Sequence, residues 1–314
     1  MPAKPKILTK QQILKELADW IDPYRVTDGA RFRLKKIDPT DTRGLKAEDG
    51  GDDHKTEAAK RLTVGRYWLS AEQDKLYAQD RRSLLIIFQA MDAAGKDSTI
   101  KHVMTGVNPQ GVHVVAFKQP SQEELDHDWM WRCYRLFPER GRIGIFNRSY
   151  YEEALVVRVQ KEILAAQKLP PECVGKDIFQ QRLRDMVTFE DYLVRNGTSV
   201  VKFFLHVSRK EQKKRLLERL DEPSKNWKFA SADLNQRERW NEYMDAYEQA
   251  IRATATPRAP WFVVPADNKW FTRLVVVGAI VEALEKMNLH YPRVDRKQRA
   301  ELARSRQLLL KEKS

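Results

Sequence analysis

Short apolar runs alternate with amphipathic stretches along the chain from residue 84 onward. The runs are rich in Val, Ile, Leu and Phe, which is typical of buried strands, and the stretches between them have helical spacing. Because a parallel sheet flanked by helices produces this alternation, the pattern predicts an α/β fold. We expect strands over residues 84–89, 112–117, 142–146, 200–207 and 261–264. We expect helices over residues 121–137, 177–195, 209–220, 235–252 and 268–287.

The two ends of the chain carry weaker patterns. Residues 10–21 place large apolar side chains at helical spacing, which predicts a helix, whereas residues 22–60 are rich in Asp, Gly, Lys and Thr and predict an irregular arm. Within this arm, residues 44–60 have little to bury, so we expect a mobile loop there. The expected organisation is an N-terminal helix and arm packing on the core (1–80), a core (81–292) and a charged C-terminal tail or helix (293–314).

Composition indicates a globular protein that attracts anions. Hydrophobic residues make up 42% of the 314 positions and charged residues 32%, which is enough apolar material for one packed core. Lys and Arg number 57 against 44 Asp and Glu, for a net charge of +13. Such a charge raises the local concentration of polyphosphate, nucleotides, nucleic acid or acidic lipid, and charge alone does not choose among them.

Cysteine content and hydropathy indicate a cytoplasmic protein. The chain has only two cysteines, Cys133 and Cys173, too few for a disulfide framework or a zinc site of four thiolates. The first residues lack the apolar stretch of a secretory signal, and the longest apolar run, residues 274–281, is too short to cross a bilayer. We therefore expect neither export nor membrane insertion.

One segment, LLIIFQAMDAAGKDSTIKHV, has the order of a phosphate-binding loop: a buried strand, a tight turn and the start of a helix. Backbone N–H groups at a helix start carry partial positive charge and can hold phosphate oxygens, to which Lys96 adds a full charge. The small residues Ala93, Ala94 and Gly95 let the backbone approach the phosphate closely. A chance turn after a strand is the alternative interpretation of the Gly-Lys pair alone.

The loop departs from the common P-loop pattern at two positions. Ala90 stands where the first Gly belongs, and Asp97 stands where a magnesium-binding hydroxyl follows the lysine. Asp92 lies inside the loop, where its carboxylate would repel phosphate unless a cation bridged the two. Asp92 therefore predicts Mg²⁺, with Mn²⁺ as a substitute, between the loop and its phosphate.

Several blocks of the sequence together resemble the polyphosphate kinase 2 family. They are AMDAAGKDSTIKHVMTGVNPQG, PSQEELDHDWMWR, LFPERGRIGIFNRSYYEEALVVRV, KFFLHVSRKEQKKRLLERLDEPSKNWKFASADLNQRERWNEYMDAY and APWFVVPADNKWFTRL. The resemblance implies a thymidylate-kinase-like P-loop kinase fold, in which a parallel five-stranded sheet lies between helices and a helical lid covers about residues 208–240. It also implies metal-dependent, reversible phosphate transfer between polyphosphate and nucleotides, and assembly into homodimers or tetramers.

The stretch FNRSYYEE bears on the acceptor nucleotide. Glu152 in this position resembles the class of members that accepts both nucleoside monophosphates and diphosphates, whereas members restricted to diphosphates carry Asn. The expected route is therefore AMP to ADP to ATP, with GMP and GDP as further candidate acceptors. Many members have Asp where this chain has Asn147, so Glu152 or Glu153 could supply the missing carboxylate ligand. A solvated helix start is the alternative interpretation of the two glutamates.

The residues then take expected roles. For catalysis we expect Asp92 as metal ligand, Lys96 at the transferred phosphate and Arg148 to neutralise its charge. Three lid cations, Arg215, Arg219 and Lys228, are expected to bind polyphosphate together with the backbone of the phosphate loop, although a solvated charged helix would show the same pattern. The expected nucleotide-binding residues are Arg132, Asn147 and Glu152.

Two other functions share parts of this evidence. An ATP-dependent nucleoside monophosphate kinase would have the same fold and loop, but the missing Ser or Thr after Lys96 and the basic lid favour polyphosphate as donor. A non-catalytic polyanion or RNA binder would use the basic surface alone and would not need Asp92. We expect polyphosphate, AMP, ADP and ATP as partners, with no specific nucleic acid and no membrane.

Overall fold

The computed structural model describes residues 18–44, 52–229 and 232–312. Its centre is a six-stranded sheet in the order β1-β6-β5-β2-β4-β3. The strands are β1 Arg25–Val26, β2 Ser83–Gln89, β3 Val112–Ala116, β4 Ile143–Asn147, β5 Thr198–His206 and β6 Trp261–Pro265. The five predicted strands run parallel. The prediction missed the two-residue strand β1, which pairs antiparallel with β6, so the sheet is mixed.

Strand β2 occupies the middle of the sheet, and its sequence explains why. All seven residues of SLLIIFQ are buried, because β4 and β5 pair with it on either side and helices cover both faces. Phe88 stacks on Phe203 of β5 with ring centroids 5.0 Å apart. A strand this apolar has no solvent face, which places its carboxyl end inside the molecule.

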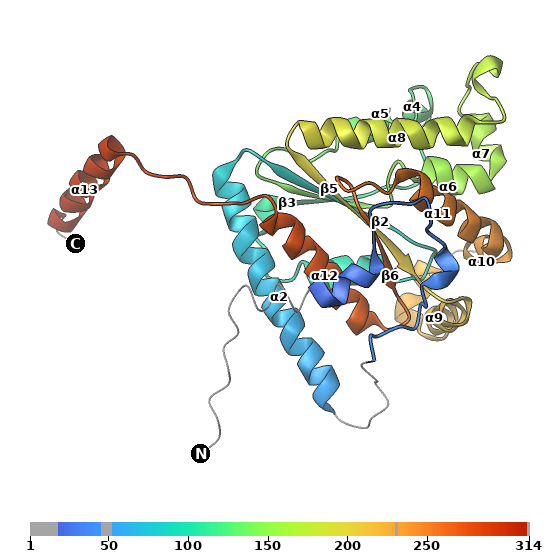
Figure 1. The fold of residues 1–314 in the computed structure, drawn as a ribbon, viewed down its shortest axis with the longest axis horizontal. Helices are drawn as coiled ribbons and strands as arrows, with labels where there is room; N and C mark the ends of the chain where they lie inside the picture. Colours follow the sequence, from blue (N-terminus) through green and yellow to red (C-terminus); the bar gives the residue numbers. More distant parts are fainter. Residues whose placement is uncertain (1–17, 45–51, 230–231, 313–314) are drawn as a thin grey trace.

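Helices form a layer on each face of the sheet (Figure 1). One layer contains α2, α3 and α12, and the other contains α6, α8 and α11. The helices are α2 Asp52–Gln79, α3 Lys96–Val103, α4 Gln122–Leu125, α5 Trp131–Tyr134, α6 Glu152–Val159, α7 Lys161–Ala166, α8 Ile178–Arg195, α9 Arg209–Asp221, α10 Ala232–Glu238, α11 Trp240–Thr254, α12 Lys269–Glu285 and α13 Arg296–Lys311. Short 3₁₀ helices are η1 Asp22–Tyr24, η2 Leu34–Lys36, η3 Pro109–Gly111, η4 Pro171–Cys173 and η5 Pro223–Lys228.

Two predicted helices are interrupted in the structure. The helix expected over 121–137 begins with the predicted capping box of Ser121 and Glu124 but is split into α4 and α5. Between them the Asp128 carboxylate accepts a hydrogen bond from the Met130 N–H at 2.9 Å, an Asx turn that competes with helix continuation. The helix expected over 235–252 is likewise split, into α10 and α11, at Arg239.

The prediction of a mobile loop over 44–60 is wrong for its second half, because helix α2 begins at Asp52. This helix is stabilised by packing on α12, where Leu69 and Leu76 are fully buried. Gly65 permits the close approach, since a Cβ at this position would lie 2.9 Å from Val277. The polar start of the helix has no apolar pattern of its own, so the sequence did not reveal it. Residues 45–51 lie outside the described residues.

The two ends of the chain differ in how they contact the core. Most of the helix expected over 10–21 lies outside the described residues, and residues 18–21 are helical. The arm that follows packs on the core, with Tyr24 buried edge-to-face against Phe271 at a centroid distance of 5.8 Å. Helix α13 is exposed and projects away from the body (Figure 1). The boundaries at 80 and 292 stay a prediction.

Of the helices in the described part of the chain, none is both long and apolar enough to cross a membrane.

Candidate active site

The segment from Ala90 to Lys96 turns sharply between strand β2 and helix α3. Ala93 (φ 61°) and Gly95 (φ 105°) both adopt left-handed backbone conformations, which lets the chain reverse and start a helix within a few residues. The Gly95 carbonyl accepts the Thr99 N–H at 2.9 Å and so begins α3. Since β2 is central and its neighbours lead away on opposite sides, the loop lies where ligands bind in open α/β sheets.

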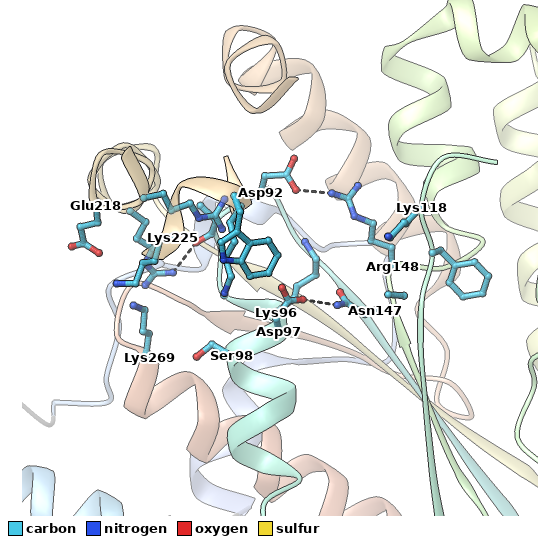
Figure 2. Close-up of a pocket in the computed structure, with 18 residues that line it drawn as sticks. Asp92, Lys96, Asp97, Ser98, Lys118, Asn147, Arg148, Glu218, Lys225 and Lys269 are labelled. Carbon is cyan, nitrogen blue, oxygen red and sulfur yellow. Dashed lines mark hydrogen bonds and ion pairs between the residues drawn. The ribbon is translucent and has the colours of Figure 1, made fainter. Parts of the chain in front are cut away.

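A cavity of about 740 Å³ opens at this loop (Figure 2). It brings together nine of the predicted residues from separate segments: Asp92, Ala93, Gly95, Lys96, Asn147, Arg148, Arg215, Arg219 and Lys228. Ala94 lines neither this cavity nor the next, because it is buried behind the loop. Lys118, Lys225, Trp227 and Lys269 also line the cavity. The predicted set omitted Lys118 and Lys269, although both lie shortly after the carboxyl ends of strands, β3 and β6, where a parallel sheet positions its ligands.

A second cavity, of about 590 Å³, adjoins the first at Asp92 and Arg148, which line both. Of the predicted nucleotide-binding residues, Arg132 and Glu152 line it, whereas Asn147 lines the first cavity. The Arg132 guanidinium donates to the Lys118 carbonyl at 2.8 Å and lies 5.2 Å from the Phe117 ring centroid. The site is therefore two-sided, and three charged side chains, Asp92, Lys118 and Arg148, line both cavities.

Arg148 connects the two carboxylates at this junction. Its Nη2 donates to Asp92 Oδ1 at 2.6 Å, and its Nη1 donates to Glu152 Oε2 at 3.0 Å (Figure 2 shows the first contact). The negative charge of Glu152, assisted by Asp92, raises the pKa of the Arg148 guanidinium, which is therefore always charged. The arrangement fixes a positive charge between the phosphate loop and the second cavity.

Lys96 is buried beneath the loop, where its ammonium group donates to the Ala90 carbonyl at 3.1 Å. Burial, together with the positive charge of Arg148, lowers the pKa of Lys96 to about 8. A phosphate bound at the loop would place a negative charge beside this ammonium group. Lys96 thus has a favourable electrostatic interaction to gain when an anion binds.

The remaining acidic candidates differ in the partners that their carboxylates contact. Asp97 accepts a hydrogen bond from the Asn147 amide at 2.6 Å, so its carboxylate and Asn147 face one another in the first cavity (Figure 2). Glu153 is buried in an ion pair with Arg182 at 2.8 Å, and burial raises the pKa of Glu153. Glu152, in contrast, is linked to Asp92 of the phosphate loop through Arg148, which contacts both carboxylates.

The donor set fits a hard divalent cation whose other ligands come from substrate. Asp92 and Asp97 offer carboxylate oxygens in the same cavity as the phosphate loop. Within the described ranges, no group of three or more His, Cys, Asp or Glu side chains forms a metal cage. Mg²⁺ is commonly held by one or two carboxylates plus phosphate oxygens and water, which is what this site can provide.

The lid cations form two groups. Arg219, Lys225 and Lys228 line the mouth of the first cavity, and Lys228 lies 5.0 Å from the ring centroid of Trp227, which is 78% exposed. Arg215, in contrast, is only 5% exposed and donates to backbone carbonyls of the phosphate loop. The lid thus contributes both a basic rim and a buried contact to the loop.

A phosphate loop on the central strand, a lysine and an arginine around it, and carboxylates suited to a divalent cation define a P-loop phosphotransferase. The chain belongs to the polyphosphate kinase 2 family, since residues 52–292 match the family described as "Polyphosphate kinase 2 (PPK2)". This result confirms the predicted family and the predicted enzyme class. The individual site-residue roles remain predictions.

Relatives and solved structures agree with this assignment. The chain is 52% identical over 244 residues (77% of this chain, 84% of the relative) to an ADP-polyphosphate phosphotransferase of Rhodopseudomonas palustris. It is 44% identical over 269 residues (86% and 94%) to an AMP/ADP-polyphosphate phosphotransferase of Meiothermus ruber. The crystal structure of Polyphosphate Kinase 2 from Arthrobacter aurescens TC1 superposes with a TM-score of 0.81 at 37% identity, covering 93% of this chain and 96% of that one. The predicted P-loop kinase fold is thereby confirmed.

Proposed function

We propose that this enzyme transfers the terminal phosphate of polyphosphate to AMP and to ADP, reversibly, with GMP and GDP as further acceptors. The observation that carries the proposal is the pair of cavities that meet at Asp92 and Arg148. A donor and an acceptor can thus approach one transfer point from two sides. The relatives' names divide between ADP and AMP/ADP, and Glu152 beside the second cavity favours the broader range.

The first cavity suits the polyphosphate donor. Lys96 and the N–H groups around Gly95 would hold the phosphate at the transfer point, and Arg219 and Lys228 would bind phosphates further along the chain. Polyphosphate carries regularly spaced negative charge, so a basic rim can bind it without recognising any sequence. Lys118, Lys225 and Lys269 extend this rim.

The second cavity suits the acceptor nucleotide. Arg132 offers a guanidinium group for an acceptor phosphate or sugar, and Asn147, the other candidate, lines the neighbouring cavity, where its amide donates to Asp97. The acceptor group is itself a phosphate with a second pKa of about 6, so at neutral pH it is mostly ionised and needs no general base. We therefore assign the protein a role in orientation and charge neutralisation, and none in proton removal.

In the transfer step, the bond between the terminal phosphorus and its bridging oxygen breaks, and a bond from that phosphorus to an acceptor phosphate oxygen forms. Polyphosphate becomes one unit shorter and retains the bridging oxygen. Arg148, held between Asp92 and Glu152, neutralises charge on the moving group. Its two ion pairs keep the guanidinium in place before substrate arrives.

We assign Mg²⁺, or Mn²⁺ in its place, to Asp92, which shares the phosphate-loop cavity with Asp97. Glu152, which shares Arg148 with Asp92, is the candidate second carboxylate. When bound, the cation neutralises negative charge on the phosphate oxygens. Glu153, the other candidate, is occupied by Arg182 in the protein interior, so we favour Glu152 over it.

The test is incubation of the protein with AMP, Mg²⁺ and polyphosphate in the absence of ATP. We expect ADP to form first and ATP to follow, and we expect Lys96→Ala and omission of Mg²⁺ each to abolish both products. Failure to form ADP would refute the proposal. Product formation that requires added ATP would identify a nucleoside monophosphate kinase, and polyphosphate binding without any turnover would identify a simple polyanion binder.

Location and assembly complete the proposal. We place the enzyme in the cytoplasm, where its nucleotide substrates are found. Both cysteines are free thiols, which is compatible with a reducing compartment. We expect a homodimer or tetramer, which light scattering would show as two or four times the chain mass of 36.8 kDa.

A further inference from the structure

Arg215 uses every one of its hydrogen-bond donors inside the protein. A guanidinium group has five N–H bonds. Nη1 donates to the carbonyls of Ala93 (3.3 Å) and Ala94 (2.8 Å), and Nη2 donates to those of Ala266 (2.7 Å) and Asp267 (3.0 Å). Nε donates to Glu211 at 2.8 Å. Five donors thus meet five acceptors, and none is left for a phosphate.

Two buried glutamines complete the contact between lid and loop. Gln212 of α9 donates through its Nε2 to the Asp92 carbonyl at 3.0 Å, and its side chain is fully buried. Gln236 of α10 accepts the Asp92 N–H through its Oε1, also at 3.0 Å, and is 6% exposed. Together with Arg215 they contact the backbone of three consecutive loop residues, Asp92, Ala93 and Ala94.

These contacts orient the loop for anion binding. A carbonyl oxygen that faced the cavity would repel phosphate, and three of the loop's carbonyls are instead directed to Gln212 and Arg215. With the carbonyls held on the lid side, the N–H groups near Gly95 can face the cavity. Ala93 adopts a left-handed conformation that costs a non-glycine residue energy, so it needs support from its surroundings.

We propose that Arg215, Gln212 and Gln236 are positioning residues that hold the phosphate loop by its backbone and so couple the lid helices to the transfer point. The proposal rests on the proposed function, and it assigns Arg215 a role different from the direct polyphosphate contact expected from its sequence. Arg219, one turn further along α9, lines the cavity and keeps the direct role.

The test exploits the difference between lysine and arginine. Arg215→Lys keeps the positive charge. An ammonium group, however, cannot donate to the carbonyls of Ala93 and Ala94 and to those of Ala266 and Asp267 as the planar guanidinium group does. We expect kcat to fall about 10- to 100-fold, because the loop is misplaced. The polyphosphate KM should depend on salt concentration as it does in the wild type. Arg219→Ala should instead raise this KM and lower its salt slope by about 0.7–0.9, the loss of one phosphate contact. Lys213→Met, on the exposed face of α9, is the control and should change neither value.

Two results would overturn the proposal. One is an Arg215→Lys enzyme whose kcat stays within about twofold of wild type, because the hydrogen bonds to the loop carbonyls would then not be needed. The other is an Arg215→Met enzyme whose salt slope falls as in Arg219→Ala, because only a cation in contact with polyphosphate contributes to that slope.

A second measurement does not depend on activity. Gln212→Met removes the donor to the Asp92 carbonyl, and with it the acceptor of Arg237, while keeping the side-chain volume. We expect faster amide hydrogen exchange in peptides that cover Asp92 to Gly95. Unchanged exchange there would refute the role of the lid contacts, even if Arg215→Lys fails to fold. Because exchange is measured without substrate, its outcome is separate from that of the AMP assay, which tests the proposed function itself.

Discussion

At the scale of single residues, Arg148 illustrates how the site is fixed. It follows β4 in a left-handed backbone conformation with φ 66°, which is costly for a side chain of this size. Its N–H donates to the Phe88 carbonyl of β2 at 3.0 Å, and two carboxylates hold its guanidinium group. The surrounding contacts thus offset the strain and direct the charge to the junction of the two cavities.

The lowered pKa of Lys96 leads to a pH prediction. In the free enzyme this pKa is about 8, so Lys96 loses its proton as the pH rises through 8, and kcat/KM for polyphosphate should fall on the alkaline side. The effect of pH on the free energy of unfolding has the opposite sign. The unfolded chain retains the proton up to its higher pKa, so the contribution of Lys96 to the free energy of unfolding rises with pH between the folded and unfolded values.

The measurement is kcat/KM from pH 6 to 10. Lys96→Arg keeps its charge throughout, so its residual activity should lack the alkaline decline. A wild-type profile that stays flat up to about pH 9.5 would contradict an ionised Lys96 at the phosphate, given its pKa near 8.

Glu152 gives a second prediction at this scale. Glu152→Asn keeps a polar side chain but removes the charge that balances Arg148. ADP brings an additional phosphate charge that can take its place, whereas AMP does not. We expect kcat/KM for AMP to fall roughly 10- to 100-fold, as for loss of one charged hydrogen bond, and that for ADP to change by less than about threefold. Parallel assays with both acceptors measure the ratio, and an unchanged ratio would remove Glu152 from acceptor selection.

At the scale of elements, a buried polar network joins β5, α8 and the start of α6. Glu190 of α8 accepts hydrogen bonds from Tyr150 (2.9 Å) and Tyr151 (2.8 Å) and pairs with Lys202 of β5. The Lys202 ammonium also donates to the Thr254 carbonyl at 2.8 Å, and burial lowers the pKa of Lys202. This network anchors the two tyrosines that directly precede Glu152, so it supports the turn on which Arg148 and Glu152 lie.

We predict that Lys202→Met lowers the free energy of unfolding by about 3–5 kcal/mol, because it leaves the Glu190 charge buried without its cation. Adding Glu190→Gln in the same chain should recover part of this loss by removing the uncompensated charge. Urea unfolding of the wild type, the single and the double variant measures both effects. A single variant as stable as wild type would show that the pair contributes nothing.

At the scale of the whole molecule, positive charge is concentrated around one of the two cavities. The chain carries a net charge of +13. Eight lysine and arginine side chains and three carboxylates line the first cavity, whereas three basic and four acidic side chains line the second. Helix α13 adds a further basic segment, which lies beyond the family match at residue 292. The electrostatic field therefore favours a polymeric anion in the first cavity, the proposed donor side.

We predict that salt weakens polyphosphate binding more than AMP binding. Each phosphate contact contributes a slope of about 0.7–0.9 to a plot of log KM against log salt concentration, and several cations line the donor cavity. The slope for polyphosphate should therefore exceed about 2, and that for AMP should be about 1 or less. Steady-state kinetics between 50 and 300 mM salt, roughly the range in which such slopes are resolved, provide the comparison. Equal slopes would contradict a donor site built on charge.

The sequence by itself determined the features whose information is contiguous. The apolar run of β2, the small residues after it and Lys96 identify the phosphate loop, because strand, turn and helix start follow one another within 20 residues. Strands β4, β5 and β6 and helix α12 were also predicted, since their burial leaves a nearly unbroken apolar pattern. The edge strand β3 is largely exposed and was predicted from its β-branched residues. The family blocks lie in the same contiguous segments, so the order of residues along the chain is sufficient to infer the fold and the enzyme class.

Only the tertiary structure decided which side chains contact one another across segments. It paired Glu153 with Arg182 and directed Arg215 to the loop carbonyls, although the sequence and its resemblance to the family suggested a candidate metal ligand and a substrate contact. It also stabilised the polar start of α2 through packing of its later turns on α12. Such contacts depend on residues far apart in the chain, and their energies come from burial and from donors and acceptors that meet only once the sheet has formed.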